Sequence, residues 1–393
     1  MKRFYVFCFL VAAFFLQQSL LAQPKGTDFD VVAQKLVTLC ADIKEGEIVL
    51  VTGSVRDAVL LEDIAVQVRK VGAFPMISIW SDRLTRRMFT DVPVKYDTQR
   101  SEWDVKLAGI VNSIISVDVG EAEGLLADIP PERFAVRIKA NEGIDKMFRN
   151  QKVRMVNLGN DLYPTKTLAK RYKVSMKDLT DIFWNGVNVD YTKLQVTGDA
   201  VRNSLEKGKQ IHITTPAGTD LTVQIEGKPV QISDGVISDE DMKRGPAGYY
   251  VWLPAGEVYV TPVVGTAEGK VVVEKYSYAG KVIEGLTLTF NAGKVVSITA
   301  KSGLKRLKEV YDAASEGKEK FAVVDFGINP NVKIPAGSDM VAYMPAGMVT
   351  VGIGGNAWAG GENDIGFGLQ FHLTRATVTI DGKAIVESGM LKP

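Results

Sequence analysis

The sequence predicts an α/β plus α+β protein: an open α/β domain with a parallel sheet, followed by a mainly antiparallel α+β domain. In the first half, apolar runs bounded by glycine alternate with segments whose apolar residues recur at helical spacing, which is typical of strand, helix, strand units. In the second half, short strands with alternating polar and apolar residues follow one another through tight turns. Because 393 residues exceed what one core usually supports, we expect domains at residues 23–200 and 201–393.

Residues 1–22 are set apart from both domains. Lys2 and Arg3 precede an apolar run from Phe4 to Leu16, and a polar break then leads to Ala22, a pattern that predicts a secretory signal peptide. An uncleaved membrane anchor is the alternative, but the run of about 13 apolar residues is shorter than the roughly 20 that span a bilayer. We therefore expect an exported protein, periplasmic or secreted, with no membrane span after removal of the signal.

The elements of the first half begin with a helix over residues 28–41. The unbroken apolar run at 48–53 suits a strand that is covered on both faces. A helix over 59–71 ends at Gly72, and a second strand follows at 74–80. This order implies a parallel sheet, to which the sequence adds strands at 110–119 and 135–138 and a helical stretch over 166–184.

The second half begins with a hairpin. Residues 211–215 and 220–225 alternate between polar and apolar side chains on either side of Pro216-Ala217-Gly218. A helix is predicted over 303–314, and Asp239-Glu240-Asp241 indicates a helix start or a solvated turn. The further predicted strands are 258–260, 269–276, 286–290, 294–300, 349–353 and 377–380.

Charge, cysteine and motif content exclude several classes of protein. The net charge is +1 with acidic and basic residues interleaved, so we expect no nucleic-acid partner. Cys8 lies in the predicted signal, and Cys40 belongs to an apolar stripe at helical spacing, which favours a packing role. The turn at Thr52-Gly53-Ser54 lacks both the dinucleotide-binding glycine pattern and a Walker lysine, so nucleotide binding is not predicted.

The order of several short segments carries a family resemblance. These segments are Tyr163-Pro164-Thr165, Thr219-Asp220-Leu221, Leu253-Pro254-Ala255-Gly256-Glu257-Val258, Phe290-Asn291-Ala292-Gly293-Lys294-Val295, Gly327-Ile328-Asn329-Pro330, Gly347 to Gly354, Gly360-Gly361-Glu362-Asn363 and Asp381-Gly382. Over the whole mature chain, their number, order and spacing resemble the metallo-aminopeptidases of the aminopeptidase T and aminopeptidase S type. The resemblance implies that family's two-domain fold, metal-dependent release of N-terminal amino acids from peptides, and a homodimer.

The resemblance also implies two divalent metal ions, Zn, Mn or Co, in the second domain. In that family, carboxylates bridge and neutralise the two cations and imidazoles fix them, which makes a bound water acidic enough to attack a peptide carbonyl. Glu257 matches the first ligand position. The four other positions carry residues that do not replace an imidazole or a carboxylate: Val323, Thr350, Gly368 and Gln370. We therefore expect the dinuclear site to be lost.

Three interpretations of the remaining side chains stay open. Asp325 follows Val323 by two residues and lies on the same face of a strand, so Glu257, Asp325 and His372 form a candidate single-metal site. Alternatively, His372 is a strand histidine with one hydrogen-bond partner, and Glu257 accepts backbone hydrogen bonds after its turn. Residues that are candidates for lining a ligand cleft are Trp252, Trp358 and Glu362.

Three hypotheses about function follow. The first is an exported aminopeptidase-like protein whose degenerate cleft binds a peptide or a small molecule without efficient hydrolysis. The second is an active hydrolase with a rearranged single-metal site. The third is a scaffold protein of the cell envelope.

Overall fold

The computed structural model describes residues 28–118, 122 and 124–392. The predicted signal peptide at 1–22 lies outside the described residues. Within the part that is described, no helix has the length and apolar character needed to cross a membrane.

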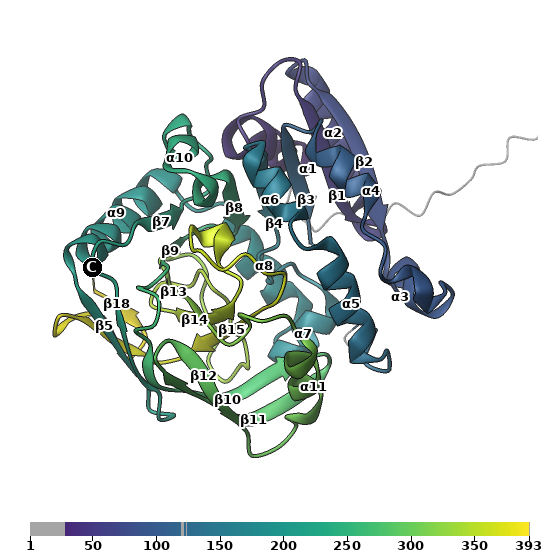
Figure 1. The fold of residues 1–393 in the computed structure, drawn as a ribbon. Helices are drawn as coiled ribbons and strands as arrows, with labels where there is room; N and C mark the ends of the chain where they lie inside the picture. Colours follow the sequence, from purple (N-terminus) through teal and green to yellow (C-terminus); the bar gives the residue numbers. More distant parts are fainter. Residues whose placement is uncertain (1–27, 119–121, 123, 393) are drawn as a thin grey trace, which may run out of the picture.

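A five-stranded parallel sheet forms the core of the first half and confirms the predicted open α/β architecture (Figure 1). Its strand order is β2-β1-β3-β4-β8, and every neighbouring pair is parallel. The interior strand β1 is mostly buried, as its apolar run predicts. The bounds are β1 Ile48–Ser54, β2 Phe74–Trp80, β3 Ser113–Val117, β4 Arg154–Leu158 and β8 Tyr250–Leu253.

Helices connect and cover these strands. They are α1 Phe29–Lys35, which continues as a π-helical turn at Leu36–Cys40, then α2 Ala58–Lys70, α3 Asp82–Thr90, α4 Glu102–Ala108, α5 Pro131–Asn141, α6 Ile144–Asn150, α7 Lys166–Tyr172 and α8 Met176–Val187. The next helix, α9 Tyr191–Lys207, packs against strands of the second half. The predicted strand at 135–138 is wrong, because these residues lie inside α5, which starts with Pro131 in its first turn. The predicted helix over 166–184 is two helices, since Lys173 adopts a left-handed conformation that ends α7.

Two antiparallel sheets build most of the second half. The first has the order β12-β11-β10-β6-β5-β16-β17-β18 and contains the predicted hairpin, β5 with β6. The second has the order β15-β14-β13-β9-β7. The bounds are β5 Gln210–Thr214, β6 Asp220–Gln224, β7 Val230–Ser233, β9 Glu257–Val260, β10 Glu268–Tyr278, β11 Lys281–Asn291, β12 Lys294–Thr299, β13 Phe321–Gly327, β14 Val349–Gly354, β15 Gly368–Leu373, β16 Thr377–Ile380, β17 Lys383–Glu387 and β18 Met390–Leu391, with helices α10 Asp239–Arg244 and α11 Lys305–Ala313.

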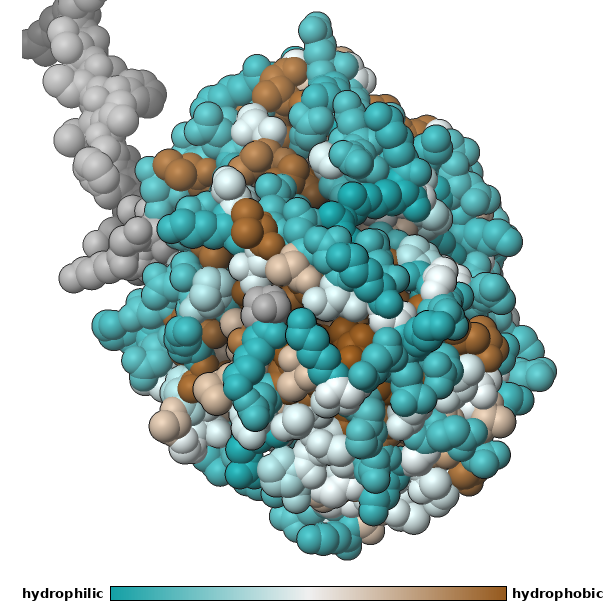
Figure 2. Space-filling view, turned by 90° about the vertical axis from the view of Figure 1, so that its left-hand side faces the viewer, coloured by the Kyte–Doolittle hydropathy of each residue, from teal (hydrophilic) through white to brown (hydrophobic). Residues whose placement is uncertain are grey.

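The two halves share one continuous hydrophobic core. Its buried members run along the chain from Val32 to Val386. Strand β8, which follows residue 200, completes the sheet of the first half, so the division predicted at residue 200 does not separate the sheets. Hydrophilic residues cover most of the face in Figure 2, and hydrophobic residues form smaller, separate groups there.

Candidate functional site

One face of the sheet β15-β14-β13-β9-β7 gathers polar side chains. The strand register sets Asp325 opposite Thr350, and Thr350 opposite His372. Since alternate residues of a strand share a face, Val323 and Gln370 lie on this face too. The opposite face carries the apolar residues Val258, Val324, Phe326, Val351 and Phe371, which belong to the main core. The sequence alternation therefore brings five of the predicted positions, and Glu257, to one surface.

The turn before β9 positions Glu257. Gly256 has a φ of +126°, and a Cβ there would lie 2.9 Å from the backbone nitrogen of Asn329, so only glycine fits. The Ile328 N–H donates to the Gly256 carbonyl at 2.8 Å, and Asn329 Nδ2 donates to the Ala255 carbonyl at 2.6 Å. These hydrogen bonds join the segments 253–258 and 327–330, which the sequence analysis identified separately, and they hold Glu257 in place at the start of β9.

Glu257 opens onto a cavity of about 420 Å³, which we call the small cavity. Asp325, Val323 and Gln370 line it from the sheet, and the carboxyl ends of β3 and β4 close it from the first half. Asn160 Nδ2 donates to Glu257 Oε1 and, at 3.2 Å, to the Pro254 carbonyl. The remaining lining residues are Ile114, Ser116, Asp118, Met155, Asn157, Asn160, Asp161, Tyr250, Trp252, Tyr259, Tyr343 and Trp358.

Burial shifts the carboxyl groups of the small cavity towards their neutral forms. Desolvation raises the pKa of Glu257 to about 8 against the opposing hydrogen bond from Asn160. Desolvation, together with the nearby Glu257, raises the pKa of Asp325 well above its ordinary value. Burial raises the pKa of Asp118 to about 6, although Asn157 Nδ2 donates to its Oδ1 at 2.8 Å. Burial therefore favours the protonated form of both Glu257 and Asp325 when nothing cationic lies beside them.

Two acceptor atoms on this face lack a partner. Asp325 Oδ1 and Gln370 Oε1 are buried, and neither makes a hydrogen bond within the part of the chain that is described. Native structures leave few buried polar atoms unpaired, so such atoms call for an explanation.

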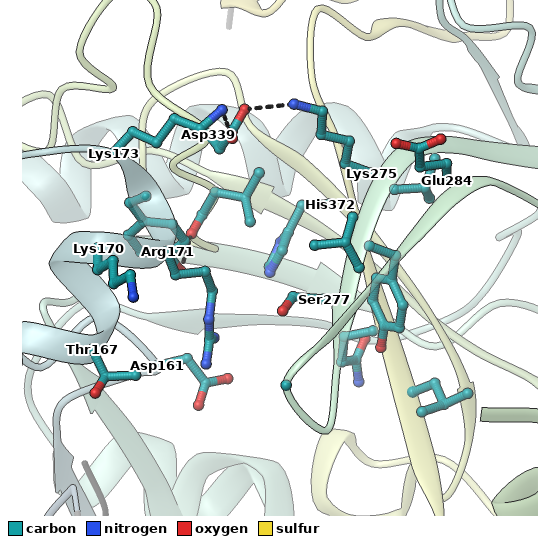
Figure 3. A pocket seen from close by; sticks show the side chains of 18 of the residues that line it. Asp161, Thr167, Lys170, Arg171, Lys173, Lys275, Ser277, Glu284, Asp339 and His372 are labelled. Carbon is teal, nitrogen blue, oxygen red and sulfur yellow. Dashed lines mark hydrogen bonds and ion pairs between the residues drawn. The ribbon is translucent and has the colours of Figure 1, made fainter. Parts of the chain in front are cut away.

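His372 lines a larger groove of about 1,150 Å³, and Gln370 lines both this groove and the small cavity. Figure 3 shows its ring in this large groove, together with Arg171 and Asp161, whose charges interact. His372 Nδ1 and Thr350 Oγ1 share a hydrogen bond of 2.8 Å, and burial lowers the pKa of His372 to about 4. Among the residues that the structure describes, Thr350 is the hydrogen-bond partner of His372, and His372 does not line the small cavity with Glu257 and Asp325.

The residues present do not fit the two-metal centre that the family resemblance implies. Among the described residues, no group of three or more His, Cys, Asp and Glu side chains is placed to hold a metal ion. Glu257 and Asp325 supply two carboxyl groups, but Val323 and Gln370 stand beside them, and the only nearby imidazole is bonded to Thr350. We derive no catalytic step through metal ions from this site.

The other predicted site residues are dispersed. Trp252 and Trp358 line the small cavity. Gly368, at the start of β15, lines the large groove. Glu362 is exposed and borders neither the small cavity nor the large groove. His212 is partly exposed and bonded to Asp220 at 2.8 Å, and Cys40 is buried.

Sequence analysis did not identify the residues that the first half contributes. Asp118 follows β3, and Asn157, Asn160 and Asp161 lie at the end of β4. The carboxyl ends of parallel strands commonly line the ligand site of an open α/β sheet, and this rule would have selected them. The sequence prediction contains no strand at 154–158, so the residues at the end of β4 have no predicted partner beside the strand at 110–119.

The chain is similar to known proteins of one family. The family model described as thermophilic metalloprotease (M29) matches residues 27–321. Aminopeptidase PepS of Streptococcus thermophilus is 27% identical over 308 residues, 71% of each chain, and aminopeptidase AmpS of Bacillus subtilis (strain 168) is 26% identical over 305 residues, 71% of this chain and 72% of AmpS.

Two solved structures share the fold. Wild-type AmpT from Thermus thermophilus has a TM-score of 0.69 at 16% identity, covering 93% of this chain and 99% of AmpT. A 2,5-dihydroxypyridine dioxygenase from Pseudomonas putida KT2440 has a TM-score of 0.60 at 14% identity, covering 93% of this chain and 96% of the dioxygenase. With the matched family model extending over residues 27–321, the chain belongs to the M29 family of metalloproteases, the family of the aminopeptidase T and aminopeptidase S type.

Proposed function

We propose that this protein binds a peptide or a small molecule in the small cavity and hydrolyses peptides poorly, if at all. Its family supports metal-dependent aminopeptidase activity, and peptides are the substrates that the family suggests. The single observation that carries the proposal is the composition of one sheet face. Where the resemblance implies five ligands for two metal ions, that face offers Glu257, a valine, a threonine, a glycine and a glutamine.

The chemistry of the face supports poor hydrolysis. Two cations held by one matching carboxyl group would be insufficiently neutralised, and the neutral oxygens of Thr350 and Gln370 bind transition metals weakly. Burial favours the protonated forms of Glu257 and Asp325, and a carboxyl group must lose its proton before it coordinates a metal ion.

A single-metal hydrolase is the second candidate. The observation in its favour is that Asp325 Oδ1 and Gln370 Oε1 are unpartnered acceptors beside Glu257. His372, the imidazole expected to complete such a site, lines the large groove instead. The export predicted from residues 1–22, the homodimer and the scaffold role remain predictions that metal content and activity do not decide.

Metal analysis and an activity panel test the proposal. We expect the protein, purified without chelator, to contain no stoichiometric Zn, Mn, Co or Fe, and to release aminoacyl chromophores slowly with or without added metal. Restoring the family residues in a variant with Val323→Glu, Thr350→His, Gly368→His and Gln370→Asp should increase metal binding over the wild type. Two tightly bound ions in the wild type together with rapid, metal-dependent turnover would contradict the proposal, and one tightly bound ion with turnover would establish the second candidate.

A further inference from the structure

An apolar pocket of about 440 Å³ lies beside helices α5 and α11, and we call it the α5–α11 pocket. The two helices come from different halves of the chain and pack against each other (Figure 1). The pocket has no described lining residue in common with the small cavity, whereas Gly368 and Leu369 also line the large groove. The lining residues are Gly124, Leu125, Leu126, Ala127, Phe134, Ile138, Tyr278, Ala279, Arg306, Val310, Gly366, Phe367, Gly368 and Leu369.

The wall of this pocket is almost entirely apolar. Phe134 of α5, Val310 of α11 and Leu369 of β15 each contribute an apolar side chain. Among the described lining residues, Tyr278 and Arg306 alone have polar atoms in their side chains. This composition favours an alkyl chain over a peptide, because amide groups buried here would lose water and find few side-chain partners.

The guanidinium of Arg306 is not fully hydrogen-bonded. The Arg306 side chain is 18% exposed, and its Nη2 donates to the Ile129 carbonyl at 2.7 Å. Its Nε is buried and has no hydrogen-bond partner among the residues that the structure describes. Its Nη1 lies 3.9 Å from Oε2 of Glu309, which is beyond hydrogen-bond distance, and the Glu309 side chain is 41% exposed. Because a guanidinium has five N–H donors, donors remain for an acceptor from outside the chain.

The neighbours of this guanidinium suit an anionic group. Burial raises the pKa of Tyr278, and the positive charge of Arg306 opposes that shift, so the two side chains lie near each other. Cζ of Arg306 lies 5.8 Å from the centroid of the Phe134 ring. One positive charge and a phenol therefore lie next to apolar surface, which matches a ligand with one anionic end and an apolar body.

We propose that the α5–α11 pocket binds a monocarboxylate with an alkyl chain, of the chemical class of medium-chain fatty acids, with its carboxylate on the guanidinium of Arg306. The chain lies along the apolar side chains of Phe134, Val310 and Leu369. A carboxylate and a guanidinium form charge-assisted hydrogen bonds, which are stronger than those between neutral groups. The hydroxyl of Tyr278 is a further donor beside the guanidinium.

Calorimetry on the whole protein at neutral pH tests the inference with octanoate, octanamide and N-acetyl-leucine. Octanamide keeps the chain and removes the charge, whereas N-acetyl-leucine presents the carboxylate of a peptide's C-terminal residue. We expect octanoate to bind about tenfold or more tightly than either of the others, a difference of about 1.4 kcal/mol or more. Equal binding of octanoate and octanamide, tighter binding of N-acetyl-leucine, or no binding of octanoate would overturn the inference.

A pair of arginine variants locates the carboxylate. Arg306→Met keeps an unbranched side chain but removes the guanidinium, so it should weaken octanoate binding about tenfold and leave octanamide binding unchanged. Arg244→Met is the matched control, because Arg244 lies on α10, outside the pocket, with acidic residues of its own helix at 3.9 Å and 4.0 Å. The control should bind both probes as the wild type does. An unchanged affinity of Arg306→Met for octanoate would contradict the assignment.

Ala127→Trp keeps the test decisive if Arg306→Met does not fold, as judged by circular dichroism. Ala127 is an exposed residue of the pocket wall, so a large ring there should fill the pocket and abolish octanoate binding. Binding that survives this change would lie elsewhere and would overturn the inference. Because Glu257 and Asp325 lie outside the α5–α11 pocket, the outcome does not depend on whether the protein binds metal or hydrolyses peptides.

Discussion

At the scale of single residues, Glu257 shows how burial changes the role of a side chain that the sequence identifies. Its position in the Leu253-Pro254-Ala255-Gly256-Glu257 segment was predictable, because turn residues and an acidic residue at a strand start are local signals. Its hydrogen bond with Asn160 was not predictable, because Asn160 is 97 positions away along the chain. The same holds for Asp325, whose unpaired oxygen depends on which neighbours the fold brings to it.

Glu257→Gln should change how stability depends on pH. The pKa of Glu257 is about 8 in the folded protein and near 4.5 when exposed, so the folded state binds more protons between these values. The contribution of Glu257 to the free energy of unfolding is then largest below about pH 4.5. It falls by up to about 1.4 kcal/mol per pH unit until about pH 8. Glu257→Gln should remove this part of the decline, as measured by urea unfolding at pH 5, 7 and 8.5. Glu240→Gln, an exposed control on α10, should keep it; an identical decline in wild type and Glu257→Gln would contradict the assignment.

Thr350→Val should destabilise the protein by about 1–3 kcal/mol, because it removes the hydrogen-bond partner of Nδ1 in the half-buried His372. Chemical denaturation measures the effect, and Thr379→Val, a half-buried strand threonine on β16, is the control for the loss of a hydroxyl. A loss in the free energy of unfolding no larger than that of Thr379→Val would show that the hydrogen bond between Thr350 and His372 does not stabilise the protein.

At the scale of elements, helices and strands with a clear local pattern were predictable from the sequence, whereas those that depend on tertiary contacts were not. Strand β1, helix α2 and the β5–β6 hairpin were predictable because each has a clear period and clear turn residues. Residues 135–138 were assigned to a strand because a short apolar run has no period of its own, and α5 is recognised only from Pro131 and the full helical length. Strand β8 was missed since its four residues join a sheet built by residues far upstream.

Gly256→Ala should be among the more damaging single changes in the turn before β9. The Cβ would approach the Asn329 nitrogen to 2.9 Å at a φ of +126°, so we expect a loss of about 3 kcal/mol or more. Gly227→Ala also has a positive φ, of +71°, but its Cβ meets nothing within 4 Å, so it should cost only about 1 kcal/mol. Thermal melting of both variants separates the effect of the steric contact with Asn329 from the effect of the positive φ. Equal losses of stability in the two variants would refute the argument.

At the scale of the whole molecule, the shared core makes the two halves interdependent. The buried cluster extends from Val32 to Val386, and the small cavity takes its walls from both halves. The sequence predicts the fold class correctly, since the periodicity of apolar residues changes near the middle of the chain and the family resemblance covers the mature protein. It could not show the cavity, because that depends on how the ends of β3 and β4 meet β9 and β13.

Unfolding should accordingly be a single cooperative event. We expect the transitions followed by far-ultraviolet circular dichroism and by tryptophan fluorescence to coincide in urea. A fragment of residues 28–207 should show no cooperative transition, because it lacks β8 and much of the core. Separate transitions in the whole chain, or cooperative unfolding of the fragment, would contradict this view.

The place of β8 in the first sheet has a consequence for biosynthesis. Tyr250–Leu253 pairs with β4, so the edge of β4 stays open while the roughly hundred residues between them are being translated. A nascent chain in that interval exposes unsatisfied backbone groups at this edge. Molecules halted before residue 250 would therefore be the ones that holdase chaperones capture, and ribosome-stalled lengths on either side of that residue would differ in protease resistance.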